Sequence, residues 1–236
     1  MPQKLYLIPN TLGDNEDPSA SMGKEVKEAL LSTSCFVVEN LKQARRYLVR
    51  WQLKEKIDQS LFIIHNKKTE VESLIEAERI FKSGESIGMI SDAGCPAIAD
   101  PGNQLVQLAH RLHIPVVPLS GPSSIFLALM ASGMNGQSFT FNGYLPREQE
   151  LRITALRKLE KRSKGNGSCQ IFMETPYRNM ALLEDLIKNL ESTTRLCCAS
   201  NLRTDHELVI SKNVAEWRKN PKPNLNKVPT IFLIQV

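Results

Sequence analysis

The chain has 236 residues, 42% of them hydrophobic and 23% charged, and its formal net charge is +5. This composition is that of an ordinary globular protein with one large domain or two modest ones. No apolar run approaches the roughly 20 residues that span a membrane, and no signal segment precedes the first predicted strand, so we expect a cytoplasmic protein. Five cysteines without CxxC spacing indicate reduced thiols, and four scattered histidines offer no metal-ligand pattern.

The first half of the chain alternates short apolar runs with longer segments of helical periodicity. The predicted strands are Leu5–Ile8, Cys35–Glu39, Leu61–Ile64, Ile87–Ser91 and Val116–Leu119. The predicted helices are Lys24–Leu31, Leu41–Leu53, Val71–Lys82 and Gln104–Leu112. In the third helix we expect Val71, Leu74, Ile75, Ile80 and Phe81 to face the core. Strict alternation of this kind predicts a mainly parallel sheet covered by helices.

The pattern changes after Pro122, where a helix at Ser123–Met130 is followed by several strands. The predicted strands are Phe139–Leu145, Cys169–Glu174, Leu196–Asn201, Glu207–Ser211 and Thr230–Val236. Two long helices, Gln149–Arg162 and Asn179–Leu190, and a flexible loop at Lys164–Ser168 lie among them. The sequence thus predicts an α/β protein of two domains: an N-terminal domain, 1–119, with a five-stranded, mainly parallel sheet, and a C-terminal domain, 120–236, with a mixed sheet.

Two turns rich in small residues are the main candidates for ligand binding. SDAGCPAIADPG at Ser91–Gly102 follows a predicted buried strand, and SGPSS at Ser120–Ser124 opens a helix. In open α/β sheets, ligands bind at the carboxyl edge, where such turns lie. Free N–H groups and serine hydroxyls at a helix start suit a carboxylate or a ribose hydroxyl. A tight connector and an ordinary helix cap are the alternatives.

No GxGxxG, GxxxxGK[ST], GxSxG or HExxH signature is present, which argues against a Rossmann dinucleotide site, a phosphate loop, a hydrolase elbow and a zinc helix. Instead, eight motifs occur in the order typical of one family. They are NTLGD (10–14), ENLK (39–42), SDAGCPAIADPG (91–102), SGPSS (120–124), SGM (132–134), FNGYLP (141–146), ETPYR (174–178) and NLRT (201–204). With these motifs the chain resembles the tetrapyrrole methylase superfamily, and within it the branch of ribosomal RNA small subunit methyltransferase I.

The resemblance implies a methyltransferase that binds S-adenosylmethionine (SAM) in a cleft between the two domains. The residues expected to contact SAM are Asp92, Ala93, Gly94, Pro96, Ala97, Ile98, Ala99, Ser123, Ser124, Tyr144, Leu145, Met173, Asn201, Leu202, Pro229 and Thr230. It also implies a homodimer, and a two-fold pair is the commonest soluble assembly.

Methyl transfer from a sulfonium is an in-line displacement, so positioning is the protein's main task. A ribose hydroxyl also needs a general base, for which the candidates are Glu39, Asp92, Asp100 and Glu174, with Asp14 a further acid at a turn. Asp92 and Asp100 alternatively cap loop N–H groups.

RNA or a ribosomal subunit is the leading substrate, with ribose 2′-O the leading acceptor. Basic residues gather at 147–164, and Arg147, Arg152, Lys158 and Lys161 are expected on one accessible helix face. A plain solvated helix face is the alternative reading.

The chain departs from the branch pattern at Asn40–Lys42, at Asn201–Thr204, and at Leu12 and Tyr177. The cofactor motifs are therefore better kept than the presumed substrate motifs. A small-molecule, tetrapyrrole-type methylase and a weakly catalytic SAM-binding regulatory protein remain as alternatives.

Overall fold

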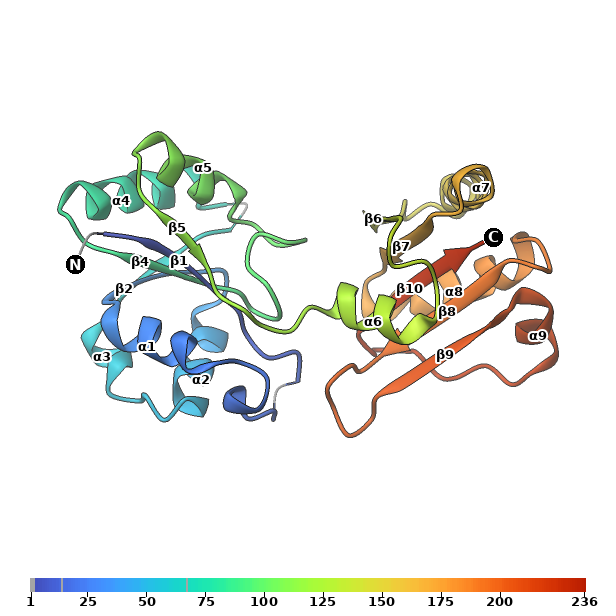
Figure 1. Cartoon of the computed structure of the whole chain (residues 1–236), viewed down its shortest axis with the longest axis horizontal. Helices are drawn as coiled ribbons and strands as arrows, with labels where there is room; N and C mark the ends of the chain where they lie inside the picture. The colour runs from blue at the N-terminus through green and yellow to red at the C-terminus, as the bar shows by residue number, and fades with distance from the viewer. Residues whose placement is uncertain (1–2, 14, 67) are drawn as a thin grey trace. The chain divides into compact units, whose positions relative to one another are not determined.

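The structure is a computed structural model that describes residues 3–13, 15–66 and 68–236 (Figure 1). The chain forms two compact units, Met1–Ser123 and Ser124–Val236. Each unit contains its own five-stranded sheet and its own hydrophobic core. In the part of the chain that is described, no helix is long and apolar enough to cross a bilayer.

The N-terminal unit is built on a wholly parallel sheet, as the alternating pattern predicted. Its strands are β1 (Leu5–Ile8), β2 (Cys35–Val38), β3 (Leu61–Ile64), β4 (Ile87–Ile90) and β5 (Val116–Pro118). They lie in the order β3-β2-β4-β1-β5, and every neighbouring pair is parallel. All five carboxyl ends therefore meet at one edge of this sheet.

Helices cover both faces of that sheet (Figure 1). They are α1 (Lys24–Ser32), α2 (Leu41–Arg50), α3 (Lys56–Gln59), α4 (Glu70–Lys82) and α5 (Asn103–Arg111), with a 3-10 turn η1 at Pro18–Ala20. Alternate strand residues point to opposite faces. Thus Val37 packs in the core with α4 and α5, whereas Phe36 and Val38 pack in the core with α1 and α2.

One expectation about α4 was wrong. Leu74, Ile80 and Phe81 face the core as predicted, but Val71 and Ile75 are 66% and 65% exposed. Ala77 and the small polar Ser73 instead occupy the buried side of the helix. Apolar spacing alone does not separate two adjacent faces of one helix.

The C-terminal unit contains a mixed sheet, also as predicted. Its strands are β6 (Phe139–Tyr144), β7 (Cys169–Met173), β8 (Arg195–Ser200), β9 (Leu208–Asn213) and β10 (Thr230–Gln235). The order is β6-β7-β10-β8-β9, in which only β6 and β7 pair in parallel. Consequently the carboxyl ends of β6, β7 and β8 lie at the same edge as the amino end of β10.

The remaining helices pack on the two faces of this second sheet. They are α6 (Ser124–Ser132), α7 (Gln149–Asn166), α8 (Asn179–Asn189) and α9 (Val214–Lys219), with η2 at Pro176–Arg178. Phe232 and Ile234 of β10 pack in the core with α7, α8 and α9. The prediction of a flexible loop at Lys164–Ser168 was wrong. Helix α7 continues to Asn166, and Gly167, with a φ of +66°, forms its left-handed cap.

Candidate functional site

The loop after β4, Ser91–Gly102, carries the sequence that pointed to a ligand. Gly94 and Gly102 have φ of +72° and +125°, and the non-glycine residues Ala97 and Ala99 have φ of +61° and +62°. Positive φ at a residue with a Cβ is unfavourable, and such residues concentrate at functional sites. The loop is thus held in a tight, costly conformation at the carboxyl edge of the sheet.

Asn10, two residues after the end of β1, fixes this loop. Its backbone exchanges two hydrogen bonds with Gly94, of 2.9 and 3.1 Å. Its buried side-chain amide also donates to the carbonyl oxygens of Ser91 and Asp92, at 3.0 and 3.1 Å. These four bonds join residues more than eighty positions apart and set where the loop can receive a ligand.

Carboxyl groups gather around the start of the loop. Glu39 follows β2 and is exposed, while Asp92 and Asp100 are half-buried on the loop itself. Ser91 Oγ lies 2.6 Å from Asp100 Oδ2. Burial raises the pKa of both aspartates, and the charge of Asp100 raises the pKa of Asp92 further. Within the described residues neither aspartate has an ion-pair partner, so both favour an approaching cation.

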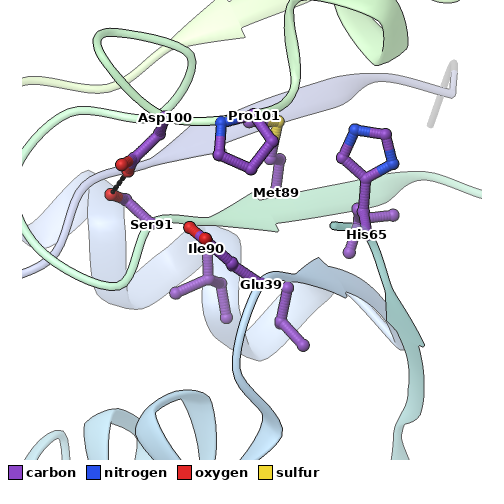
Figure 2. Close-up of a pocket in the computed structure, with 9 residues that line it drawn as sticks. Glu39, His65, Met89, Ile90, Ser91, Asp100 and Pro101 are labelled. Carbon is purple, nitrogen blue, oxygen red and sulfur yellow. Dashed lines mark hydrogen bonds between the residues drawn. The ribbon is translucent and has the colours of Figure 1, made fainter. Parts of the chain in front are cut away.

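His65, at the end of β3, is a buried group at the same edge that the sequence analysis did not select. It lines a cavity of about 10 Å³, room for one water, together with Glu39 and Asp100 (Figure 2). Its Nδ1 lies 2.7 Å from Ser73 Oγ, and that hydroxyl donates to the Glu70 carbonyl. The signal available in the sequence was its place directly after an apolar strand, the same signal that selected Glu39.

We expect His65→Gln to lower the free energy of unfolding by about 1 kcal/mol at neutral pH, because the bond to Ser73 is lost. Burial lowers the pKa of His65, although Glu70 partly raises it. The unfolded chain therefore binds more protons, and His65 destabilises the fold as pH falls through about 6.5. Denaturation at several pH values should give a shallower acid loss for the variant than for wild type. Parallel curves would contradict the prediction.

In the C-terminal unit, the sheet brings several predicted cofactor residues to one edge. Tyr144 pairs with Met173, and Met173 pairs with Ile231 across the other side. A register shift between Phe141 and Tyr144 marks an irregularity at the end of β6. Thr230 pairs with Ser200, and the backbone N–H of Asn201 donates a hydrogen bond of 3.0 Å to the Pro229 carbonyl oxygen. Leu145 and Leu202 follow β6 and β8 and are buried.

Glu174, a predicted base, lies at the same edge but is already engaged. Its carboxylate accepts a hydrogen bond from the Thr175 N–H at 2.6 Å and another from the Arg178 guanidinium. Burial alone would raise its pKa, yet these donors together lower it. A carboxylate stabilised in its charged form is a weak base, and the role of Glu174 as a base stays a prediction.

The predicted substrate residues are not all accessible: Arg152 was expected on an exposed helix face but is buried. Its side chain is 6% exposed, and its Nε and Nη2 donate to Asp185 Oδ2 at 2.8 and 2.6 Å. A helix-face pattern of charges cannot reveal a buried partner on another helix. Arg147, Lys158 and Lys161 are exposed.

The other predicted site residues fall where the motifs placed them along the chain. Ala93, Pro96 and Ile98 belong to the loop after β4, Ser123 precedes α6, and Ser124 begins α6. Their role in cofactor binding stays a prediction. Asp14 lies outside the described residues.

Comparisons with known proteins point to one enzyme. No family model matches the chain. It is 30% identical to "Ribosomal RNA small subunit methyltransferase I" of Vibrio cholerae over 212 residues, 90% of this chain and 69% of that protein. It is 32% identical to the protein of the same name from Halalkalibacterium halodurans, over 87% of this chain and 66% of that protein. It is also 30% identical to the protein of the same name from Pasteurella multocida, over 98% of this chain and 78% of that protein.

Solved structures share the fold over the whole chain. The methyltransferase CobJ has a TM-score of 0.66 at 15% identity, covering 99% of this chain and 94% of its own. A uroporphyrin-III C-methyltransferase from Thermus thermophilus, complexed with S-adenosylhomocysteine, has a TM-score of 0.55 at 13% identity, covering 98% and 97%. At these identities the likeness establishes the fold alone, and it confirms the expected two-domain α/β fold class.

Proposed function

Because the chain belongs to the family of ribosomal RNA small subunit methyltransferase I, we propose that it transfers a methyl group from SAM to RNA, with a ribose 2′-hydroxyl as acceptor. The observation that carries the proposal is the Ser91–Gly102 loop, which combines the motif of that family with a fixed place at the carboxyl edge of a parallel sheet. The names of the relatives support RNA as the substrate class.

The residues at this edge fit SAM by their chemistry. When bound, SAM supplies an activated methyl group on a positively charged sulfonium, and it carries an ammonium group as well. Asp92 and Asp100 are carboxyl groups without an ion-pair partner among the described residues, and burial disfavours their charged form. A nearby cation offsets that cost. The tightly wound loop also leaves little side-chain bulk to obstruct a ligand.

The chain's own residues then have three tasks. The loop fixed by Asn10 positions the ligand, and orientation of this kind supplies several kcal/mol of a barrier, up to about 7–11 in ideal cases. Met89 and Ile90 are buried beneath the loop, in the cores on the two faces of the sheet, and give it a rigid base. Asp92 or Asp100 accepts the proton of the attacking hydroxyl: burial raises the pKa of both, and the one that does not face the SAM cation keeps that raised pKa and is the stronger base.

The test offers methyl-labelled SAM to three acceptors in parallel: total RNA, assembled ribosomal subunits and a metabolite extract. We expect label in RNA, and most of it in the small subunit. Label confined to the extract would replace this proposal with a small-molecule methylase. Calorimetric SAM binding without transfer to any acceptor would indicate a regulatory SAM-binding protein.

The assembly and location of the protein are part of the same proposal. A homodimer follows from the family resemblance and from the frequency of two-fold pairs. The cytoplasmic location expected from the sequence is proposed with it.

A further inference from the structure

A groove with a basic lining runs along α2, and we name it the α2 groove. Its volume is about 760 Å³, within the range of pockets that admit small organic ligands. Its lining includes Lys42, Arg45 and Arg46, all exposed, and the half-exposed Val49. Arg45 and Arg46 lie three and four residues after Lys42, so all three cations lie on one side of the helix.

The fold forces these cations outward. On the opposite side of α2, Ala44, Tyr47 and Leu48 are buried in the core with β2 and α1. The helix contains no acidic residue that could neutralise its surface. Lys42, Arg45 and Arg46 therefore form a concentrated positive surface rather than a balanced one.

On two other helices of the same unit, the surface cations lie beside acidic residues. On α4, Arg79 pairs with Glu76 at 2.6 Å and Lys82 pairs with Glu78 at 2.7 Å, while on α1 Lys24 lies 4.0 Å from Glu28. In the described part of the chain, Lys42, Arg45 and Arg46 form no such pair. Unpaired cations gathered in a concave surface attract an anionic polymer far more strongly than paired ones.

The groove is joined to the ligand loop through a fourth cation. Arg50, at the end of α2, donates to the Gly13 carbonyl at 3.0 Å and to Asn10 Oδ1 at 2.9 Å. The Asn10 amide in turn donates to the carbonyl oxygens of Ser91 and Asp92. Arg50 and Asn10 therefore connect the α2 groove by hydrogen bonds to the loop proposed to hold SAM.

We propose that the α2 groove binds the phosphate backbone of the RNA substrate through Lys42, Arg45 and Arg46. This inference rests on the proposed function and names the surface that holds its substrate. The α7 stretch is the weaker candidate, because Arg152 is buried, Lys164 pairs with Glu191 and Arg162 contacts Asn142.

The test compares two triple variants that remove the same charge. One is Lys42→Gln, Arg45→Gln and Arg46→Gln, and the control is Lys24→Gln, Arg79→Gln and Lys82→Gln on the paired surfaces. Fluorescence anisotropy follows a labelled single-stranded RNA of about 16 nucleotides, the upper site size of common single-strand binders, over a series of salt concentrations.

We expect the slope of log affinity against log salt to fall by about 2 for the α2 variant, at roughly 0.7 for each lost contact, and to change little for the control. SAM affinity and thermal unfolding should match wild type. An unchanged slope in the α2 variant, or equal losses in both variants, would overturn the inference.

Transfer of label from SAM to RNA by the wild-type protein is measured separately, so a failure of the proposed function can be distinguished from a failure of this inference. If the α2 variant instead lost binding only to an acidic protein, the groove would be a protein-docking surface and the inference would be wrong.

Discussion

Replacing Gly94 with valine is expected to raise the Kd for SAM by at least about 100-fold, equivalent to about 2.7 kcal/mol. Gly94 has a φ of +72°, which a β-branched residue resists. A Cβ at this position would also lie 3.3 Å from Leu12 Cδ2 and 3.4 Å from the Pro122 carbonyl oxygen. Leu12 or the loop must move by a few tenths of an ångström, and the valine strains the backbone conformation in which Gly94 pairs with Asn10. Isothermal titration calorimetry measures the effect directly.

Gly84 provides a matched control for this substitution. It lies in the same unit with a φ of +87°, and nothing lies within 4 Å of the Cβ it would gain. Gly84→Val therefore carries a similar backbone cost of about 1–3 kcal/mol without crowding the ligand loop. We expect its SAM affinity to equal that of wild type. If Gly94→Val stayed folded and bound SAM as tightly as Gly84→Val, the cofactor would not bind at this loop.

The parallel sheet was predictable because its strands have a strong local signal. Each strand is a short apolar run between turns, and Leu5–Ile8 and Leu61–Ile64 were predicted to the residue, although Leu61 and Ile64 of the edge strand β3 are exposed. The short helices α3 and α9, of four and six residues, were not predicted, because fewer than two turns leave no periodic pattern. Helix α7 extends past its predicted end, through the exposed Gly165, to a left-handed cap at Gly167, whose N–H donates to the Ser163 carbonyl oxygen at 2.7 Å.

The candidate site was predictable only where a motif or strand end marked it. Glu39 and Asp92 come just after apolar strands and Asp100 belongs to the loop motif, and the structure gathers the three carboxyl groups at one edge. The roles of Asn10 and His65 depend on contacts that no local pattern contains. The partners of Asn10 lie 81 and 82 residues away, and the orientation of His65 is set by a serine on α4.

The same reasoning explains why Arg152 was assigned to substrate binding. Its neighbours in sequence are basic, and a charge cluster on a helix predicts an exposed surface. Its partner Asp185 lies on α8, 33 residues away. Only the packing of α7 on α8 shows that the pair is buried.

Arg152→Ala is expected to lower the free energy of unfolding of the C-terminal unit by about 3–5 kcal/mol, as when one partner of a buried ion pair is removed. Asp185 would keep a buried charge, while the Gln149 side-chain amide would still donate to its Oδ1 at 2.8 Å. The bond from Arg152 Nη1 to the Arg147 carbonyl, of 2.7 Å, would be lost as well. Chemical denaturation followed by Trp217 fluorescence in a Trp51→Phe background reports on this unit, since Trp217 is buried within it.

Two further variants separate the buried pair from a role in substrate binding. Lys158→Ala, exposed on the same helix, should change stability by no more than about 0.5 kcal/mol. The double variant Arg152→Met with Asp185→Leu should recover most of the stability lost by Arg152→Ala, because apolar residues of similar volume replace both charges. RNA affinity should then equal wild type in the double variant, because the guanidinium has no access to a phosphate. A stable Arg152→Ala protein with weakened RNA binding would reverse this assignment and return Arg152 to the substrate surface.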